Sequence, residues 1–212
     1  MSIFEAGYAL VPAVLTDEHI NRLIELAPHW GGPLRGGARN LLNHAAIRAL
    51  ATSPALRSLI EPVLGPDCFC THATYFDKHR MANWKVPWHQ DLKIAVRERV
   101  DGAPGYSTWS VKAGVVHVQP PLAVLENILA ARIHLDDCGP GNGPLRVRPG
   151  SHLAPEREEE VVCTARRGDV LLMRPLLMHA SSAAVSPSHR RVIHLEYAVG
   201  GLPGGVTWHD RV

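Results

Sequence analysis

The sequence predicts a mainly β protein, an antiparallel double-sheet jelly roll with helices flanking it at the N-terminal end. The 18 glycines and 17 prolines fall mostly between short apolar runs, a distribution typical of short strands joined by tight turns. After about residue 66 the apolar pattern changes from a helical to an extended period. Many short strands without crossover helices between them favour an antiparallel jelly roll over a parallel α/β sheet.

The helices are expected near the N-terminus. A short strand over 7–11 precedes the first helix, for which Thr16 is the expected N-cap, with acidic residues in the first turn. A short strand near 39–42 comes before two further helices. These are expected to start near Asn43 and at Ser53, the latter followed by a proline at the first helical position, where its missing N–H does no harm.

The rest of the chain, about residues 67–200, is expected to form the β core. The apolar run over 122–131 suggests a short helix that leads into a strand over 132–137. Asn142-Gly143 is a strong hairpin signal. The alternating residues 145–148 are therefore expected to form the next strand of that hairpin.

Length and charge bound the possible functions. The 212 residues are expected to form one domain over 1–212, with the helical part at about 1–66, and can bury a sizeable core. A net charge of +2, with scattered lysines and arginines, argues against nucleic acid as a partner. No apolar run approaches the roughly 20 residues that span a bilayer, and the first residues do not resemble a signal peptide. We therefore expect a cytoplasmic protein without membrane contact; the pattern carries no signal for an oligomeric state.

The four cysteines do not form a CxxC pair, and a chain of this length does not need disulfides to fold. We expect reduced thiols. A zinc site built from these cysteines is the less favoured alternative.

A histidine and an aspartate two residues apart suggest a metal site. Side chains at i and i+2 of an extended segment share one face, so His89 and Asp91 can reach the same ion. The apolar run that ends at His179 offers a third ligand from far along the chain. Two histidines and one carboxylate, with the other positions open, form the facial triad of non-heme Fe(II) oxygenases. A packed or surface histidine is the alternative reading of each imidazole taken alone.

Such a site also requires a cation nearby. The triad leaves room for a bidentate 2-oxo acid and then O2, and 2-oxoglutarate carries a second carboxylate that arginine can clamp through two parallel hydrogen bonds. Arg190 and Arg191 open the expected last strand, over 190–199. Neighbouring residues of a strand point to opposite faces, so only one of these two arginines can face the interior.

Taken together and in this order, the motifs resemble the phytanoyl-CoA dioxygenase family over nearly the whole chain. The segments that carry the resemblance are Gly7-Tyr8 with the first helix, Trp88-His89-Gln90-Asp91, Leu135-Asp136-Asp137, Asn142-Gly143-Pro144-Leu145, Pro149-Gly150-Ser151-His152, Gly168-Asp169 with His179, and Arg190-Arg191. The resemblance implies a double-stranded β-helix fold, Fe(II), 2-oxoglutarate and O2. It also implies hydroxylation, or a related oxidation, of an unactivated C–H bond.

The resemblance assigns roles to individual residues. It matches His89, Asp91 and His179 to the iron ligands and Arg190 to the arginine that binds the far carboxylate of 2-oxoglutarate, so that Arg191 faces outward. The other candidates on the co-substrate side are Ser181, Trp109 and Arg39. The candidates on the substrate side are Trp84, Trp88, Lys112, His117 and Gln119. Core packing or solvent exposure is the alternative for Trp109, for Arg39 and for each substrate-side residue.

The expected function is therefore an Fe(II)- and 2-oxoglutarate-dependent oxygenase acting on a small metabolite or natural-product intermediate. Halogenation is disfavoured because halogenating relatives lack the carboxylate that Asp91 supplies. The chain is shorter than many family members, which makes a bulky acyl-CoA a poor candidate substrate. Two alternatives stay open: a non-catalytic metal-binding sensor or lapsed relative, and a zinc hydrolase, which would need a general base near an activated water.

Overall fold

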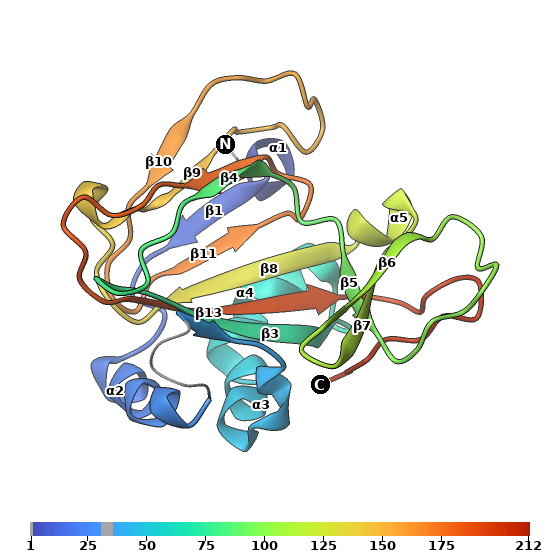
Figure 1. Ribbon diagram of the computed structural model, residues 1–212, viewed down its shortest axis with the longest axis horizontal. Coiled ribbons are helices and arrows are strands. Elements are labelled where there is room, and N and C mark those ends of the chain that lie inside the picture. Colours follow the sequence, from blue (N-terminus) through green and yellow to red (C-terminus); the bar gives the residue numbers. More distant parts are fainter. Residues whose placement is uncertain (1, 31–35) are drawn as a thin grey trace.

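The computed structural model describes residues 2–30 and 36–212 (Figure 1). Its central element is an antiparallel six-stranded sheet, called the major sheet here. In spatial order the major sheet consists of β1 (Tyr8–Val11), β11 (Val170–Met173), β8 (Ile128–His134), β13 (Arg190–Ala198), β3 (Phe69–Lys78) and β2 (Gly37–Ala38). Since β1 and β2 belong to this sheet, the N-terminal part of the chain contributes strands as well as helices.

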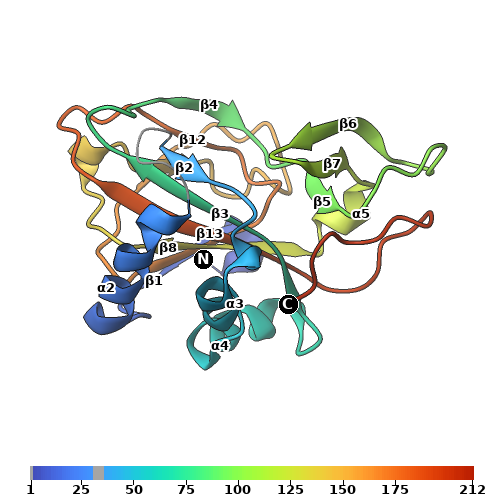
Figure 2. The same cartoon turned by 60° about the horizontal axis from the view of Figure 1, so that its bottom comes forward.

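Two smaller antiparallel sheets complete the β structure. The minor sheet consists of β10 (Val161–Cys163), β9 (Leu145–Val147), β12 (His179–Ser181) and β4 (Val86–His89). The end sheet consists of β5 (Ile94–Val96), β7 (Val115–Gln119) and β6 (Ser107–Lys112). Figure 2 shows the minor sheet on one side of the major sheet and the helices of residues 17–26, 45–51 and 54–64 on the other. The predicted jelly roll of mainly β structure is confirmed.

The helices are α1 (Ile3–Ala6), α2 (Asp17–Leu26), α3 (Ala45–Ala51), α4 (Pro54–Leu64) and α5 (Leu122–Leu125), with 3-10 turns η1 (Ala27–His29), η2 (Leu41–Asn43) and η3 (Pro140–Asn142). The sequence signals predicted α2, α3 and α4 but not α1. Thr16 and Ser53 cap α2 and α4 as predicted, because each side chain accepts a backbone hydrogen bond. The N-cap of α3 is His44, one residue after the predicted start. None of the described helices is both long and apolar enough to cross a membrane.

The alternation of side chains along β13 gives the major sheet its two faces. Ile193 and Leu195 are fully buried in the core that the sheet shares with α2, α3 and α4. The even-numbered residues of β13 point the other way, toward the minor sheet, and these include Arg190, His194 and Glu196. One strand thus contributes an apolar face to the core and a polar face to the interior between the sheets.

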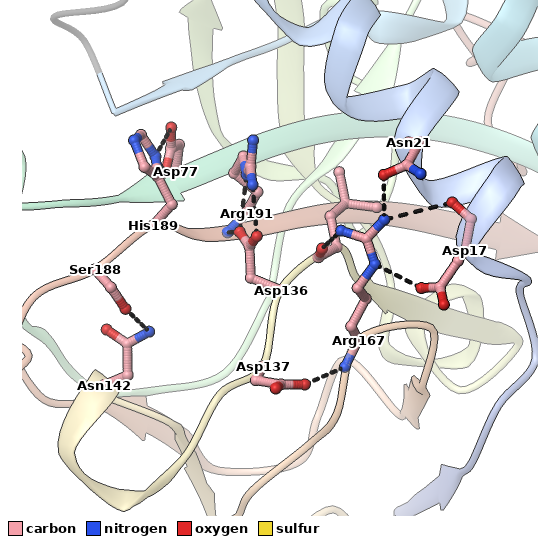
Figure 3. A network of polar contacts seen from close by, with 11 residues as sticks. Asp17, Asn21, Asp77, Asp136, Asp137, Asn142, Arg167, Ser188, His189 and Arg191 are labelled. Carbon is pink, nitrogen blue, oxygen red and sulfur yellow. Dashed lines mark hydrogen bonds and ion pairs between the residues drawn. The ribbon is translucent and has the colours of Figure 1, made fainter.

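Arg167 attaches α2 to the end of the major sheet (Figure 3). Its Nε donates to Asp17 Oδ1 at 2.9 Å and its Nη2 to Asn21 Oδ1 at 2.6 Å. Its backbone N–H donates to Asp137 Oδ1 at 2.8 Å. The same residue therefore joins the first turns of α2 to the chain that leaves β8.

The cysteines are free and buried, as expected for reduced thiols.

Two predictions for the middle of the chain were wrong. The helix expected over 122–131 is only α5, and β8 already begins at Ile128. Every residue of β8 is buried, and a strand buried on both faces gives a continuous apolar run that resembles a helix segment. Asn142-Gly143 does not close a hairpin, because β9 pairs with β10 and β12 rather than with β8. The chain crosses between sheets at this turn.

Two further segments differ from the prediction. The strand expected near 39–42 is β2, two residues earlier, followed by η2. The apolar run that ends at His179 forms two strands, β11 in the major sheet and β12 in the minor sheet, with a turn at Pro175 between them. This turn carries His179 across the interior to the opposite sheet.

We expect the apolar face of β13 to dominate the stability of the fold. Replacing the fully buried Leu195 by alanine should lower the free energy of unfolding by about 2–5 kcal/mol, because it leaves a cavity between sheet and helices. Urea denaturation measures this change. The matched control is Leu153→Ala, at a side chain that is 70% exposed, which should change stability by less than about 0.5 kcal/mol. Equal losses in the two variants would contradict the assignment of faces.

Candidate metal centre

The three predicted ligands meet in the interior between the sheets. β12 pairs with β4 so that His179 lies opposite His89, with 4.1 Å between the ring centroids. Asp91 follows two residues after His89, and its backbone N–H donates to the Pro175 carbonyl at 2.8 Å. One ligand atom from each of the three side chains lies within 4.8 Å of the other two. Segments about 90 residues apart in the sequence thus form one donor set.

Both imidazoles are oriented by backbone carbonyls. His89 Nδ1 lies 2.8 Å from the Pro87 carbonyl oxygen, and His179 Nδ1 lies 2.8 Å from the Leu177 carbonyl oxygen. A carbonyl only accepts, so each Nδ1 carries the hydrogen and each Nε2 keeps its lone pair. The two Nε2 atoms face Asp91, at 3.7 Å from Oδ1 for His89 and 3.5 Å from Oδ2 for His179.

The protonation states suit a metal ligand set. Burial opposes ionisation of Asp91, but the neighbouring His179, His194 and His89 outweigh it and lower the pKa of this carboxyl below its usual value. Burial lowers the pKa of His179 more than Asp91 raises it, so the imidazole is neutral near neutral pH. A charged carboxylate and a neutral imidazole are the forms that bind a metal ion.

The geometry fits a divalent transition metal. Ligand atoms about 2.1 Å from an ion and at right angles to one another lie about 3 Å apart. The observed separations of 3.5 and 3.7 Å are slightly wider and too long for hydrogen bonds. The side chain of His179 is 7% exposed, whereas that of Asp91 is 40% exposed toward the cavity. The donors therefore cover one side of a candidate ion and leave its other side open.

A cluster of buried cations lies on the major sheet beside this centre. Arg190 is paired across the strands with Lys78, and Arg132 on β8 lines the same cavity. Their exposed fractions are 3%, 1% and 9%. Lys78 Nζ donates to Ser181 Oγ at 2.9 Å and to the Ser182 carbonyl at 3.0 Å, while Arg190 donates to the Gly143 carbonyl. None of the ion pairs in the described part of the chain includes Lys78, Arg132 or Arg190.

Burial beside other cations lowers the pKa values of Lys78 and Arg132. Burial, together with nearby Arg190 and Arg132, lowers the pKa of the Lys78 ammonium to about 7. Burial and Arg190 lower the pKa of Arg132 to about 10. Three cations held together in this way form a site that favours an anionic ligand.

Arg191 faces away from the cavity, as the resemblance implied. Its Nε and Nη2 donate to the two carboxylate oxygens of Asp136 at 2.8 and 2.6 Å (Figure 3). The Asp136 carboxylate also accepts from the Arg191 backbone N–H at 2.8 Å. Of the two candidate arginines, the structure therefore leaves Arg190 to face the metal ligands.

A cavity of about 630 Å³ contains the ligand set and the cation cluster. Its floor is the inner face of β3, β13 and β8. Arg190 and Lys78 lie at one end of this floor, and Glu196 lies beside His72 at the other, six residues along β13. Burial, with Asp91 nearby, raises the pKa of Glu196 to about 8. The end sheet and the loop after β2 close this second end.

Most of the remaining sequence candidates line the cavity. They are Ser181 near the cation cluster, and Arg39, Trp84, Lys112, His117 and Gln119 elsewhere on its wall. The structure brings all of these into the space that also holds the three metal-ligand candidates.

Trp109 and Trp88 do not line the cavity, so both expectations need correction. On β6, Thr108 and Lys112 share the cavity face, whereas Trp109 points to the opposite side and stacks on Tyr106 at 6.1 Å between ring centroids. Trp88 neighbours His89 on β4 and therefore points to the other face. There it packs against the guanidinium groups of arginines from β9 and the following turn, 5.2 and 4.6 Å from the ring centroid.

The sequence analysis did not identify Lys78, Arg132, His194 and Glu196 as site residues. The signal for the last two was present, because they lie four and six residues after Arg190 and a strand repeats its face every second residue. Lys78 and Arg132 carried no local signal, since their position depends on which strands pair with β13.

Solved structures share this fold. SnoN, described as a non-heme alpha ketoglutarate dependent epimerase from nogalamycin biosynthesis, is 21% identical with a TM-score of 0.71, over 96% of this chain and 83% of SnoN. HygX from Streptomyces hygroscopicus, with nickel and 2-oxoglutarate bound, is 14% identical with a TM-score of 0.68, over 99% and 94%. AviO1 from Streptomyces viridochromogenes Tue57 is 25% identical with a TM-score of 0.65, over 95% and 93%.

No curated protein matches the sequence significantly. The sequence model of the phytanoyl-CoA dioxygenase family matches residues 4–192, which include all three metal-ligand candidates and Arg190. This range covers most of the chain and ends inside β13. The chain therefore belongs to the phytanoyl-CoA dioxygenase family.

Proposed function

We propose that this protein is an Fe(II)- and 2-oxoglutarate-dependent oxygenase that hydroxylates a C–H bond of a small molecule. One observation carries the proposal: an open set of two histidines and one carboxylate shares a cavity with buried cations that have no carboxylate partner among the described residues. Membership of the family supports the class of enzyme. HygX with nickel and 2-oxoglutarate, and SnoN with Fe3+ and alpha ketoglutarate, support the choice of metal and co-substrate.

The metal would be held by Nε2 of His89, the carboxylate of Asp91 and Nε2 of His179. When bound, iron and 2-oxoglutarate together supply the oxidising chemistry, in which O2 is consumed and 2-oxoglutarate is converted to succinate and CO2. The role of the protein is to orient these groups and to keep water out of the site. Since the other side of the donor set is open, a chelating 2-oxo acid has room beside the three ligands.

Arg190 is the proposed partner of the far carboxylate of 2-oxoglutarate, supported by Ser181 and Lys78. The Ser181 oxygen accepts from Lys78, so the hydroxyl hydrogen stays available to donate to a carboxylate. A carboxylate at this point would compensate the buried charges of Arg190 and Lys78. These contacts would fix one end of the co-substrate while its other end reaches the metal.

The proposed substrate is a small metabolite or natural-product intermediate. The cavity volume of about 630 Å³ falls within the range of small-molecule sites, roughly 300–1,000 Å³. Structural relatives include an epimerase and a carbocyclase, so hydroxylation is the part of the proposal that product analysis must decide.

Replacing Asp91 by alanine should abolish the activity. Loss of a charged ligand should reduce 2-oxoglutarate-dependent succinate release by about 100-fold or more, since even residues that only support a metal ligand are worth about 10- to 100-fold. The measurement is succinate formation during a screen of small molecules. The control is Asp101→Ala, whose side chain is 86% exposed and remote from the cavity. Succinate release that persists in Asp91→Ala would refute the ligand assignment.

Arg190→Ala and Arg191→Ala form a matched pair. Removing Arg190 should raise the Kd for 2-oxoglutarate by about 10- to 100-fold, because a charge-assisted contact is lost from a buried site. Removing Arg191 should leave that Kd unchanged, since its partner is Asp136 outside the cavity. Anaerobic titration of the Fe(II) protein, followed by its visible absorption band, gives both constants. If the Kd for 2-oxoglutarate increased in Arg191→Ala and not in Arg190→Ala, the face of β13 assigned to the cavity would be wrong.

The binding of 2-oxoglutarate should weaken as the pH rises above about 7. The Lys78 ammonium has a pKa of about 7 in the free protein, and a bound carboxylate favours its protonated form and raises that pKa. At a pH between the Lys78 pKa of the free protein and that of the complex, binding takes up a proton. The affinity for 2-oxoglutarate therefore falls by up to about tenfold per pH unit in this range. Lys78→Met should bind more weakly at pH 7 and lose this dependence. An unchanged pH profile in Lys78→Met would exclude Lys78 from the co-substrate site.

A further inference from the structure

Two cations stand at the end of the cavity that is remote from Arg190. Arg39 follows β2 and Lys112 ends β6, and both line the cavity. Their immediate neighbours are joined, because Asn40 Nδ2 donates to the Ala113 carbonyl at 3.0 Å. Two positive side chains from segments 73 residues apart are therefore held at one place by a hydrogen bond between adjacent residues. We call Arg39 and Lys112 the cation pair.

The backbone beside both cations is strained. Asn40 has φ = 59° and Ala113 has φ = 49°, in the left-handed region that residues other than glycine rarely adopt. Such conformations persist where the surrounding structure imposes them, and they concentrate at ligand-binding sites. Here they flank the hydrogen bond that fixes the two cationic segments against each other.

The cation pair has no anionic partner in the described residues. Neither Arg39 nor Lys112 forms an ion pair or a side-chain hydrogen bond there. Glu196 lies at the same end of the cavity but is not within 4.0 Å of either cation. The third nearby cation, Lys93, is already engaged, since its Nζ donates to the Thr108 carbonyl at 2.6 Å and to Ser110 Oγ at 3.0 Å.

The electrostatic effects agree with an unfilled anion site. Burial and the charge of Arg39 lower the pKa of Lys112. Burial lowers the pKa of His72 to about 3, with further lowering by His117 and Arg39. The histidines beside the cation pair are therefore neutral, and the positive charge at this end comes from Arg39 and Lys112 together with Lys93.

We propose that Arg39 and Lys112 bind an anionic oxygen group of the substrate, a carboxylate or a phosphate. Arginine offers parallel donors to such a group and lysine a compact charge. This inference rests on the proposed function, because it assumes that 2-oxoglutarate occupies the end at Arg190. Glu196, at the end near Lys112, lies six residues along β13 from Arg190, or about 20 Å. Arg39 follows Ala38, which pairs with Tyr75, three residues and about 10 Å along β3 from Lys78. A five-carbon diacid bound at Arg190 is too short to reach the cation pair.

Matched probes of one carbon skeleton test the proposal. Cyclohexanecarboxylate, cyclohexyl phosphate and the neutral cyclohexanecarboxamide would be titrated by calorimetry into anaerobic protein loaded with Fe(II) and 2-oxoglutarate. At least one anion should bind about tenfold or more tightly than the amide. The carboxylate and phosphate arms show which anion the site prefers. Arg39→Gln and Lys112→Gln should each reduce the preference several-fold, and the double variant should remove it.

Lys85→Gln is the control, because Lys85 is exposed and lies outside the cavity lining. It should keep the full preference for the anion. The proposal is overturned if the amide binds as well as both anions, if no probe binds to the unaltered protein, or if the double variant keeps the preference.

The visible band of the Fe(II) and 2-oxoglutarate complex separates this inference from the function on which it rests. The band should form in the unaltered protein and in Lys112→Gln, whatever the probes do. If the band is absent from the unaltered protein, the proposed function fails, and the difference in anion binding between the unaltered protein and the double variant then reports on the cation pair.

Discussion

The pairing of β12 with β4 is the constraint on which the candidate site depends. These strands are short, and their register is irregular, because His179 opposes His89 whereas Ser181 opposes Val86. The extra residue on β4 lets both Val86 and His89 face the cavity although they are three residues apart. A regular register would turn one of the two segments away. This irregularity, a β-bulge, therefore positions both the metal-ligand candidates and the cavity wall beside them.

Contacts on both sides of this pairing stabilise it. Asn83 exchanges two hydrogen bonds with Ala184, of 2.9 and 2.7 Å. At the other end Gln90 Nε2 donates to the Leu176 carbonyl, and Asp91 is joined through its backbone to Pro175. The irregular ladder is thus closed at both ends by side chains and by the turn that brings the chain over from β11. The ligands owe their positions to this frame rather than to contacts with one another.

The sequence predicted the parts of the site that depend on local spacing. His89 and Asp91 follow from the period of a strand. The same period applied to β13 required Arg190 and Arg191 to point to opposite faces, and the resemblance to the family implied that Arg191 faces outward. Trp109 was misplaced because the face of β6 that meets the cavity depends on its packing against the rest of the fold. Lys78 could not be predicted as a site residue for a related reason, since the pairing of β3 with β13 joins residues more than 100 positions apart.

The distribution of charge along the cavity suggests how a substrate is oriented. Lys78 and Arg190 lie at one end, the cation pair at the other, and the metal-ligand candidates stand between them. Phe76 and Thr74 in the middle section are uncharged, and Arg132, whose guanidinium lies over the Phe76 ring, belongs to the cation cluster with Arg190 and Lys78. An anionic co-substrate and an anionic substrate would each be drawn to a different end. A substrate fixed by its anionic group would then present the same carbon to the metal in each binding event, so selectivity for one C–H bond would follow from charge placement together with shape.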